Sequence, residues 1–178
     1  KAWWKWWPEV SKTLNILRLT GGEPLMHKST WRLFDLLQEE AKPNLELNLN
    51  SNLGVKPALV KKLATNVKDL VENKKIKNFK LFSSLDSWGK KAEYIRTGLK
   101  TELWEQNLET YIATTNAPVS IMCTFNILSV TSFTDFLQKI LEWRAKYQST
   151  MNPGGYGRRI RFDTPYLKEK LQYDMMIL

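Results

Sequence analysis

LELNLNSNLGVKPALVKKLATNVKDLVENKKIKNFKLFSS, residues 45–84, is the stretch that decides the fold. Leucine and polar residues alternate strictly over 45–51, which is typical of a strand with one buried face. From Lys56, with Pro57 in the first turn, apolar residues recur at helical spacing. Residues 78–84 then read as a second strand. This order predicts two parallel strands joined by a crossover helix.

The same order extends in both directions along the chain. Further strands are predicted at 14–19, 119–128 and 158–162, and further helices at 29–40, 102–115 and 133–148. Ser29 is the expected N-cap of the first of these helices. Five strands separated by four helices predict an α/β fold with a parallel sheet, either as an α/β barrel or as an open doubly wound sheet.

Composition narrows the class of protein. The 178 residues are 43% hydrophobic and 25% charged, as in an ordinary soluble domain. No apolar run reaches the roughly 18 residues that a membrane-spanning helix needs, so we expect a cytoplasmic protein with no membrane partner. The net charge of +9 is read as a lysine-rich surface, and a nucleic-acid partner is not expected because no nucleic-acid-binding motif is recognisable.

Two single residues have simple interpretations. Cys123, the one cysteine, lies among apolar residues of a predicted strand and is expected in the core. One cysteine allows neither an internal disulfide nor a site with several cysteine ligands. His27, the one histidine, is expected at the surface or at the start of a helix.

The first ten residues, KAWWKWWPEV, contain four tryptophans. We expect them to be the end of a helix whose indoles pack on a preceding segment, and a substrate-facing role is the second interpretation. An interfacial membrane anchor is disfavoured because the run is short and Pro8 follows it directly. The expected organisation is therefore the end of an N-terminal segment at 1–13, the main domain at 14–170 and the start of a C-terminal segment at 171–178.

Polar residues follow each predicted strand. In parallel α/β folds the ligand site lies at the carboxyl ends of the strands, so these residues should come together. They are the stretches 20–24 (TGGEP), 51–54 (SNLG), 83–86 (SSLD) and 163–165 (DTP), together with Asn126 near the end of the fourth strand.

The residue types in these stretches suit a ligand that combines an amino acid with a nucleoside. The carbonyl groups of Gly21 and Gly22 and the carboxylate of Glu23 are suited to a ligand ammonium group. The side chains of Asn52, Ser84 and Asp86 are suited to ribose hydroxyls. Each of these stretches taken alone is equally consistent with a helix cap.

TGGEP resembles the GGE motif of the radical SAM superfamily, in which the motif holds the amino group of S-adenosylmethionine. The resemblance assigns cosubstrate binding to Gly21, Gly22 and Glu23. SNLG resembles the family's TNG-like turn, with Leu53 inserted and Asn52 matched, and SSLDS resembles the family's SLD signature. These two matches and the YIRTG stretch add Asn52, Ser84, Asp86 and Arg96 to the expected cofactor-binding residues.

The resemblance implies a partial (β/α)6 TIM-like barrel with its first strand outside this chain, and it favours the twitch or SPASM type. It implies a [4Fe-4S] cluster held by a CxxxCxxC loop, which these 178 residues lack. The implied reaction is reductive cleavage of S-adenosylmethionine to a 5′-deoxyadenosyl radical that abstracts hydrogen from a substrate such as a peptide or protein. A flavodoxin or ferredoxin would donate the electron. No catalytic residue and no metal ligand is assigned within this chain.

Two other interpretations stay open. A non-catalytic barrel without a cluster could bind a nucleoside, RNA or a peptide on its basic, tryptophan-rich surface. A metal-independent barrel enzyme such as an aldolase would need a Schiff-base lysine at a strand end, and Lys80, inside a predicted strand, suits that role poorly.

Overall fold

A computed structural model describes residues 2–147 and 159–165 of the chain. Five parallel strands form one sheet, in which each strand pairs with the next along the chain in the order β1-β2-β3-β4-β5. The strands are β1 (Ile16–Leu19), β2 (Lys42–Ser51), β3 (Ile76–Ser84), β4 (Val119–Met122) and β5 (Ile160–Asp163). The predicted α/β fold with a parallel sheet is therefore confirmed.

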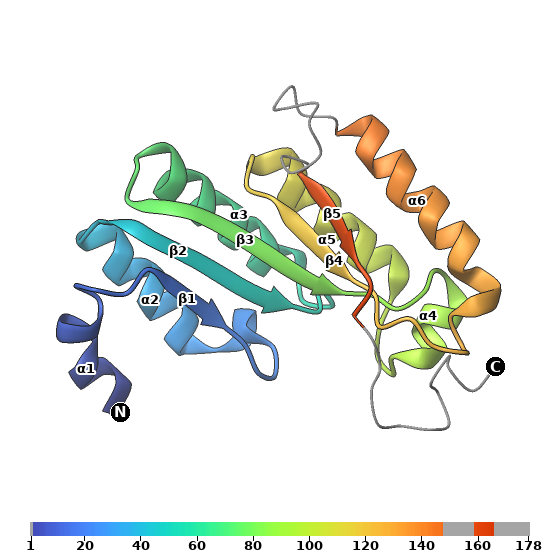
Figure 1. Ribbon diagram of the computed structural model, residues 1–178, viewed down its shortest axis with the longest axis horizontal. Coiled ribbons are helices and arrows are strands. Elements are labelled where there is room, and N and C mark those ends of the chain that lie inside the picture. The colour runs from blue at the N-terminus through green and yellow to red at the C-terminus, as the bar shows by residue number, and fades with distance from the viewer. Residues whose placement is uncertain (1, 148–158, 166–178) are drawn as a thin grey trace.

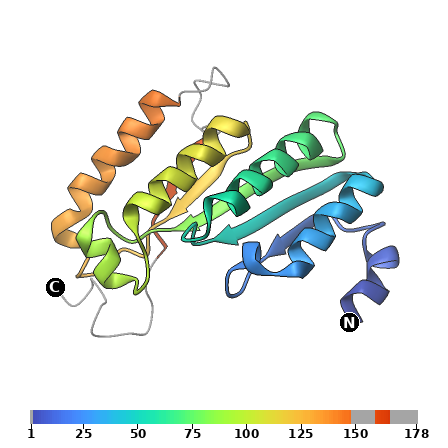
Figure 2. The same ribbon diagram turned by 180° about the vertical axis from the view of Figure 1, so that it is seen from behind.

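Helices connect the strands. They are α1 (Ala2–Val10), α2 (Lys28–Glu39), α3 (Pro57–Glu72), α4 (Lys90–Ile95), α5 (Thr101–Thr114) and α6 (Phe133–Lys146), with short 3-10 helices η1 (Pro24–Met26) and η2 (Val130–Ser132). Figures 1 and 2 show that the crossover helices α2, α3 and α5 lie on the same face of the sheet. Right-handed crossovers between strands that follow one another in the sheet place the connecting helices on one face. The opposite face carries none of these crossover helices.

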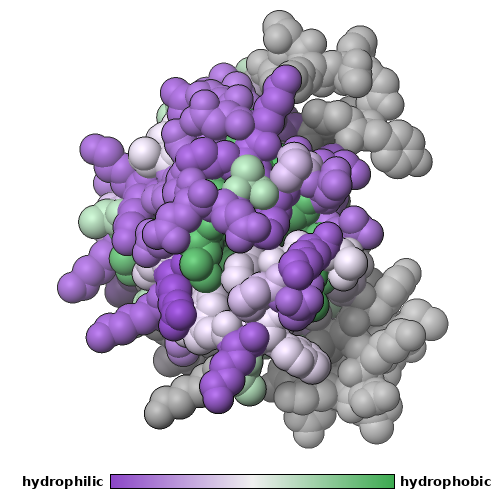
Figure 3. All heavy atoms as spheres, turned by 90° about the vertical axis from the view of Figure 1, so that its left-hand side faces the viewer, coloured by the Kyte–Doolittle hydropathy of each residue, from purple (hydrophilic) through white to green (hydrophobic). Residues whose placement is uncertain are grey.

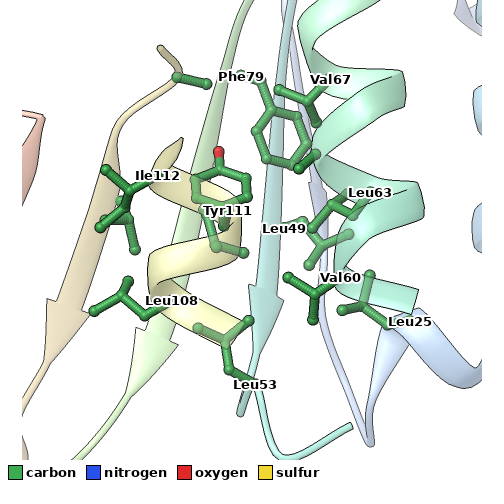
Figure 4. Packing of buried hydrophobic residues seen from close by; sticks show 14 of the residues in the cluster. Leu25, Leu49, Leu53, Val60, Leu63, Val67, Phe79, Leu108, Tyr111 and Ile112 are labelled. Atoms are coloured by element: carbon green, nitrogen blue, oxygen red, sulfur yellow. The ribbon is translucent and has the colours of Figure 1, made fainter. Parts of the chain in front are cut away.

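The hydrophobic core fills the space between the sheet and the helices. Leu45, Leu47 and Leu49 point toward the helices and are fully or almost fully buried. Figure 4 shows Leu49 and Phe79 of the sheet against residues of α3 and α5. The leucines that alternate with polar residues in the sequence of β2 therefore determine which face of the strand the helices cover.

The fourth strand is shorter than predicted. β4 ends at Met122, whereas the prediction extended it to residue 128. The side chain of Asn126 accepts a hydrogen bond from the amide of Leu128 (3.0 Å) and donates one to the carbonyl of Thr124 (2.8 Å). These local bonds close a turn and divert the backbone from the sheet.

The prediction that Ser29 is the N-cap of α2, the helix expected at 29–40, was wrong. α2 begins at Lys28, so Ser29 lies inside its first turn, and His27 occupies the N-cap position without a side-chain capping bond. The 3-10 helix η1 ends just before this point, and the amide of His27 donates to the carbonyl of Pro24 (3.0 Å). The preceding turn, rather than a hydroxyl cap, therefore sets the start of α2.

The tryptophan-rich segment is a helix, as expected, and part of it packs within the described chain. Trp7 is buried and belongs to the hydrophobic core. The Arg32 guanidinium of α2 lies 4.5 Å from the centre of the Trp4 ring. Trp6 remains 71% exposed. The expected boundary at residue 170 and the segment 171–178 lie outside the described residues.

Candidate functional site

The carboxyl ends of the strands meet at one edge of the sheet, as the parallel order predicts. Ser51 at the end of β2 is in register with Ser83 of β3, and Ser84 is in register with Met122 of β4. Parallel pairing therefore brings the loops after β1, β2 and β3 to the same edge. This edge is the candidate site.

The loop after β1 is a tight turn with an exposed backbone. Gly21 and Gly22 have φ angles of +86° and +49°, in the left-handed region that favours glycine. A Cβ atom on Gly21 would meet nothing within 4 Å, so space beside this turn is open. Among the described residues, no hydrogen bond uses the carbonyl oxygens of Gly21 and Gly22. These carbonyl groups are therefore available to a ligand.

The carboxylate of Glu23 ties this turn to the loop after β2. It accepts hydrogen bonds from the amide of Leu25 (3.1 Å), the hydroxyl of Ser51 (2.9 Å) and the amide of Asn52 (2.9 Å). Both carboxylate oxygens are thus engaged within the protein. The structure brings Glu23 and Asn52 together, and the visible role of Glu23 is to position both loops.

The loop after β2 is held by its own side chains. Asn52 accepts a hydrogen bond at Oδ1 from the amide of Gly54 (2.8 Å). Leu53 has a φ of +52° and a fully buried side chain, so the residue inserted relative to the TNG pattern fills the core. Asn107 of α5 donates to the carbonyls of Leu53 and Val55, both at 2.8 Å. This network fixes Asn52 at the edge of the sheet.

The loop after β3 carries a partly buried ion pair. The carboxylate of Asp86, 6% exposed, accepts from Arg96 Nε (2.7 Å) and from the amide of Thr124 (2.9 Å). Asp86 and Arg96 are therefore brought together, although ten residues separate them. Ser84 is half-buried and faces away from Ser83, whose hydroxyl accepts from the Trp104 indole (3.0 Å). Ser84 thus points to the face without crossover helices.

That face carries polar residues that sequence reasoning did not single out. Arg18 of β1 donates from Nε to Asn50 Oδ1 (2.9 Å), and its guanidinium carbon lies 4.3 Å from the centre of the Phe82 ring. The alternation of leucine and polar residues in β2 could have predicted this polar face, because it places Asn50 on the side of the strand that points away from the buried leucines. Arg18 lies within β1, two positions before Thr20, where the polar stretch read as the strand end begins.

A charged pair extends the polar face. Lys80 of β3 donates to the carboxylate of Glu46 on β2 (2.8 Å), and Asn48 donates to the same oxygen (3.0 Å). Burial alone would raise the pKa of Glu46, but the hydrogen bonds from Lys80 and Asn48 outweigh it and lower this pKa. Glu46 is therefore charged at neutral pH, and Lys80 has a structural partner.

A hollow of about 570 Å³ lies between α1, the end of β1 and the start of α2. Its lining includes Trp3, Trp4, Arg18, the Thr20–Gly22 turn and His27. Figure 3 looks at the side of the molecule where α1 lies; this surface is mainly hydrophilic, with a pale area of intermediate hydropathy in its lower half. The glycine turn of the candidate site is therefore part of the wall of this hollow.

Cys123 is in the core, as predicted, and its thiol is fully buried. Burial and the negative charge of Asp86 raise the pKa of this thiol to about 12. At pH 8 the thiolate fraction is then about one in ten thousand, and the thiolate is the reactive form. We expect Ellman's reagent to label Cys123 at pH 8 only after urea unfolds the protein. Rapid labelling of the folded protein would contradict this prediction.

Residues 2–147 and 159–165 contain no cluster of three or more histidine, cysteine or acidic side chains that could hold a metal ion. No helix within these ranges is long and apolar enough to cross a membrane.

Comparisons with known proteins identify no relative of this chain. No family model matches the sequence, and searches of curated proteins and of solved structures found no match either.

Proposed function

We propose that this chain forms the S-adenosylmethionine-binding part of a radical SAM-type barrel. The observation that carries the proposal is the exposed turn at Gly21 and Gly22, whose carbonyl groups are open at the carboxyl edge of a parallel sheet. A methionine ammonium group needs several acceptors, and such carbonyls can supply them. The ion pair of Asp86 and Arg96 lies at the same edge.

Each site residue then has a distinct task. Gly21 and Gly22 would accept hydrogen bonds from the methionine ammonium group, while Glu23 would hold the turn in shape. Asp86 fixes Nε of Arg96, which leaves the remaining N–H groups of this side chain to bind a ligand carboxylate or hydroxyl. Asn52 and Ser84 would contact the ribose hydroxyls from neighbouring strand ends.

The arrangement of the sheet also supports a partial (β/α)6 barrel. Strands that pair in chain order, with crossover helices on one face, are the arrangement from which α/β barrels are built. The opposite face, with Arg18, Asn50 and Ser84, would then line the barrel interior. A parallel sheet normally has both faces covered, so a polar open face suits a ligand-filled space.

The [4Fe-4S] cluster of a radical SAM enzyme does not fit the residues of this chain. Three thiolate ligands are needed, and Cys123, the one cysteine, is fully buried beneath the Asp86 loop. If the natural protein performs radical chemistry, all three cluster ligands come from residues outside these 178. The chain itself would supply cosubstrate binding and orientation.

Calorimetry with this chain tests the binding function. We expect S-adenosylmethionine to bind, and methionine and adenosine, as its separate halves, to bind more weakly because each reaches only part of the site. S-adenosylhomocysteine should bind as well, since it keeps the ammonium and ribose groups. Absence of heat and of any thermal stabilisation by millimolar S-adenosylmethionine would overturn the proposal.

A second candidate is a non-catalytic barrel that binds a nucleoside, RNA or a peptide and has no cluster. The single cysteine and the net charge of +9 favour it. Anaerobic reconstitution of the protein with iron and sulfide distinguishes the two candidates. Release of 5′-deoxyadenosine from S-adenosylmethionine with dithionite supports the radical SAM enzyme. Cosubstrate binding without release supports the binding module.

A further inference from the structure

We propose that the substrate lies on the open face of the sheet and that Arg18 binds a carboxylate group of this substrate. The open face is the side without crossover helices. In Figure 1 the strands lie in front of α2, α3 and α5, so this view looks onto the open face. Such a substrate would lie beside the bound cosubstrate, so the inference rests on the proposed function and adds the chemical class of the second ligand.

The side chain of Arg18 leans along the sheet toward the carboxyl ends of the strands. In the strand register, Arg18 of β1 stands beside Asn48 of β2, and Asn50 of β2 stands beside Phe82 of β3. Arg18 nevertheless donates from Nε to Asn50 Oδ1 (2.9 Å), and its guanidinium carbon lies 4.3 Å from the centre of the Phe82 ring. The guanidinium is therefore one row of residues closer to the strand ends than its own backbone.

A residue assigned to the cosubstrate lies on the same face, one row further on. Ser84 follows Phe82 by two residues in β3, so both side chains point to the open face. Two residues of a strand span about 7 Å. A group bound by Arg18 would therefore lie beside a nucleoside held at the strand ends.

Arg18 is oriented by the protein but not neutralised by it. Its side chain is exposed, so a ligand can reach it. Among the described residues, no acceptor takes a hydrogen bond from its two terminal nitrogens and no carboxylate forms an ion pair with it. Asn50 and the Phe82 ring hold the plane of the guanidinium. A carboxylate would thus meet a ready fork of N–H donors, and little side-chain entropy would be lost on binding.

The charges on the open face favour a ligand with one negative charge. Glu46 of β2 and Lys80 of β3 also lie on this face, and they pair with each other (2.8 Å). This pair leaves the charge of Arg18 uncompensated. Covering an unpaired guanidinium costs free energy, whereas a ligand that brings a carboxylate offsets this cost. One carboxylate matches one guanidinium, while a phosphate dianion would need a second cation.

NMR titrations of this chain without S-adenosylmethionine test the carboxylate site. Benzoate is the carboxylate probe, benzamide is its neutral counterpart, and phenyl phosphate carries a dianion. Benzoate should shift the Nε–H signal of Arg18, which Arg18→Lys identifies by its loss, and should bind about fivefold or more tightly than benzamide. Equal affinities of benzoate and benzamide would overturn the proposal. Tighter binding of phenyl phosphate than of benzoate would overturn the choice of a carboxylate.

Variants locate the bound carboxylate. Arg18→Gln should lower the affinity for benzoate about fivefold, and Arg18→Lys should lose most of that affinity because lysine lacks the planar fork. Arg32→Gln is the matched control: its guanidinium also lies over an aromatic ring, that of Trp4 at 4.5 Å, but it belongs to α2. We expect less than about a twofold change for this control, since long-range effects of one exposed charge are screened. Equal losses in Arg18→Gln and Arg32→Gln would contradict binding at Arg18.

Addition of S-adenosylmethionine separates this site from the proposed function. Benzoate should still shift the Arg18 signal when the cosubstrate is bound. Displacement of benzoate by S-adenosylmethionine would assign Arg18 to the carboxylate of the cosubstrate and overturn the substrate site. If benzoate binds through Arg18 and S-adenosylmethionine does not bind, the proposed function fails and the carboxylate site stands. If S-adenosylmethionine binds and benzoate is no better than benzamide, the proposed function stands and the carboxylate site fails.

Discussion

Glu23→Ala should lower the free energy of unfolding by about 2–4 kcal/mol. The carboxylate accepts part-buried hydrogen bonds from the amide of Leu25 and the hydroxyl of Ser51 and an exposed one from the amide of Asn52, and all three donors would lose their partner. Hydrogen bonds to a charged group contribute more than neutral ones, and unsatisfied donors add to the cost. Urea titration followed by far-UV circular dichroism measures the change.

Two further variants make the experiment specific. Glu23→Gln keeps one acceptor oxygen and should lose about half as much stability. Glu72→Ala removes an exposed carboxylate at the end of α3 and should change stability by less than about 0.5 kcal/mol. A Glu23→Ala variant as stable as Glu72→Ala would show that these bonds do not hold the loops. Loss of cosubstrate binding without loss of stability would instead point to direct contact with the ligand.

Asp86→Ala should cost about 2–3 kcal/mol. The change removes the acceptor for Arg96 Nε and for the amide of Thr124, and it leaves the arginine without its counter-ion. The cost stays below that of a fully buried pair because the Arg96 side chain is 32% exposed and water can solvate it. Chemical denaturation is the measurement.

Asp86→Asn separates charge from shape. The amide keeps one oxygen for the Thr124 amide but loses the negative charge that faces Arg96. We expect this variant to fold with a smaller loss of stability and to bind S-adenosylmethionine more weakly, because Arg96 is no longer oriented. Full stability and full binding in Asp86→Ala would remove this pair from both the fold and the site.

Most of the fold could be predicted because the spacing of apolar residues along the sequence follows which side of each strand or helix is buried. Residues 45–51 alternate because one side of β2 faces α3, and Val60, Leu63 and Val67 follow the helical period because α3 covers that side. The start of α2 could not be predicted in the same way. It depends on the turn around Pro24 rather than on the hydroxyl of Ser29.

The site was predicted only in part. The order of strands and helices was enough to place Gly21, Asn52 and Asp86 at one edge of the sheet. The partners of Glu23 were not visible, because Ser51 and Asn52 lie 28 and 29 residues away and meet it only after β1 and β2 pair. For the same reason the contact of Arg18 with Phe82 could not be found from local patterns.

The sequential order of the strands has a consequence for how the chain folds. Each strand pairs with the strand that precedes it along the chain, so sheet contacts join neighbouring segments of the sequence. The entropy lost in closing each loop stays modest, and no strand waits for a distant partner. The sheet can therefore grow one strand at a time during synthesis on the ribosome, with each new strand added to an edge that is already formed.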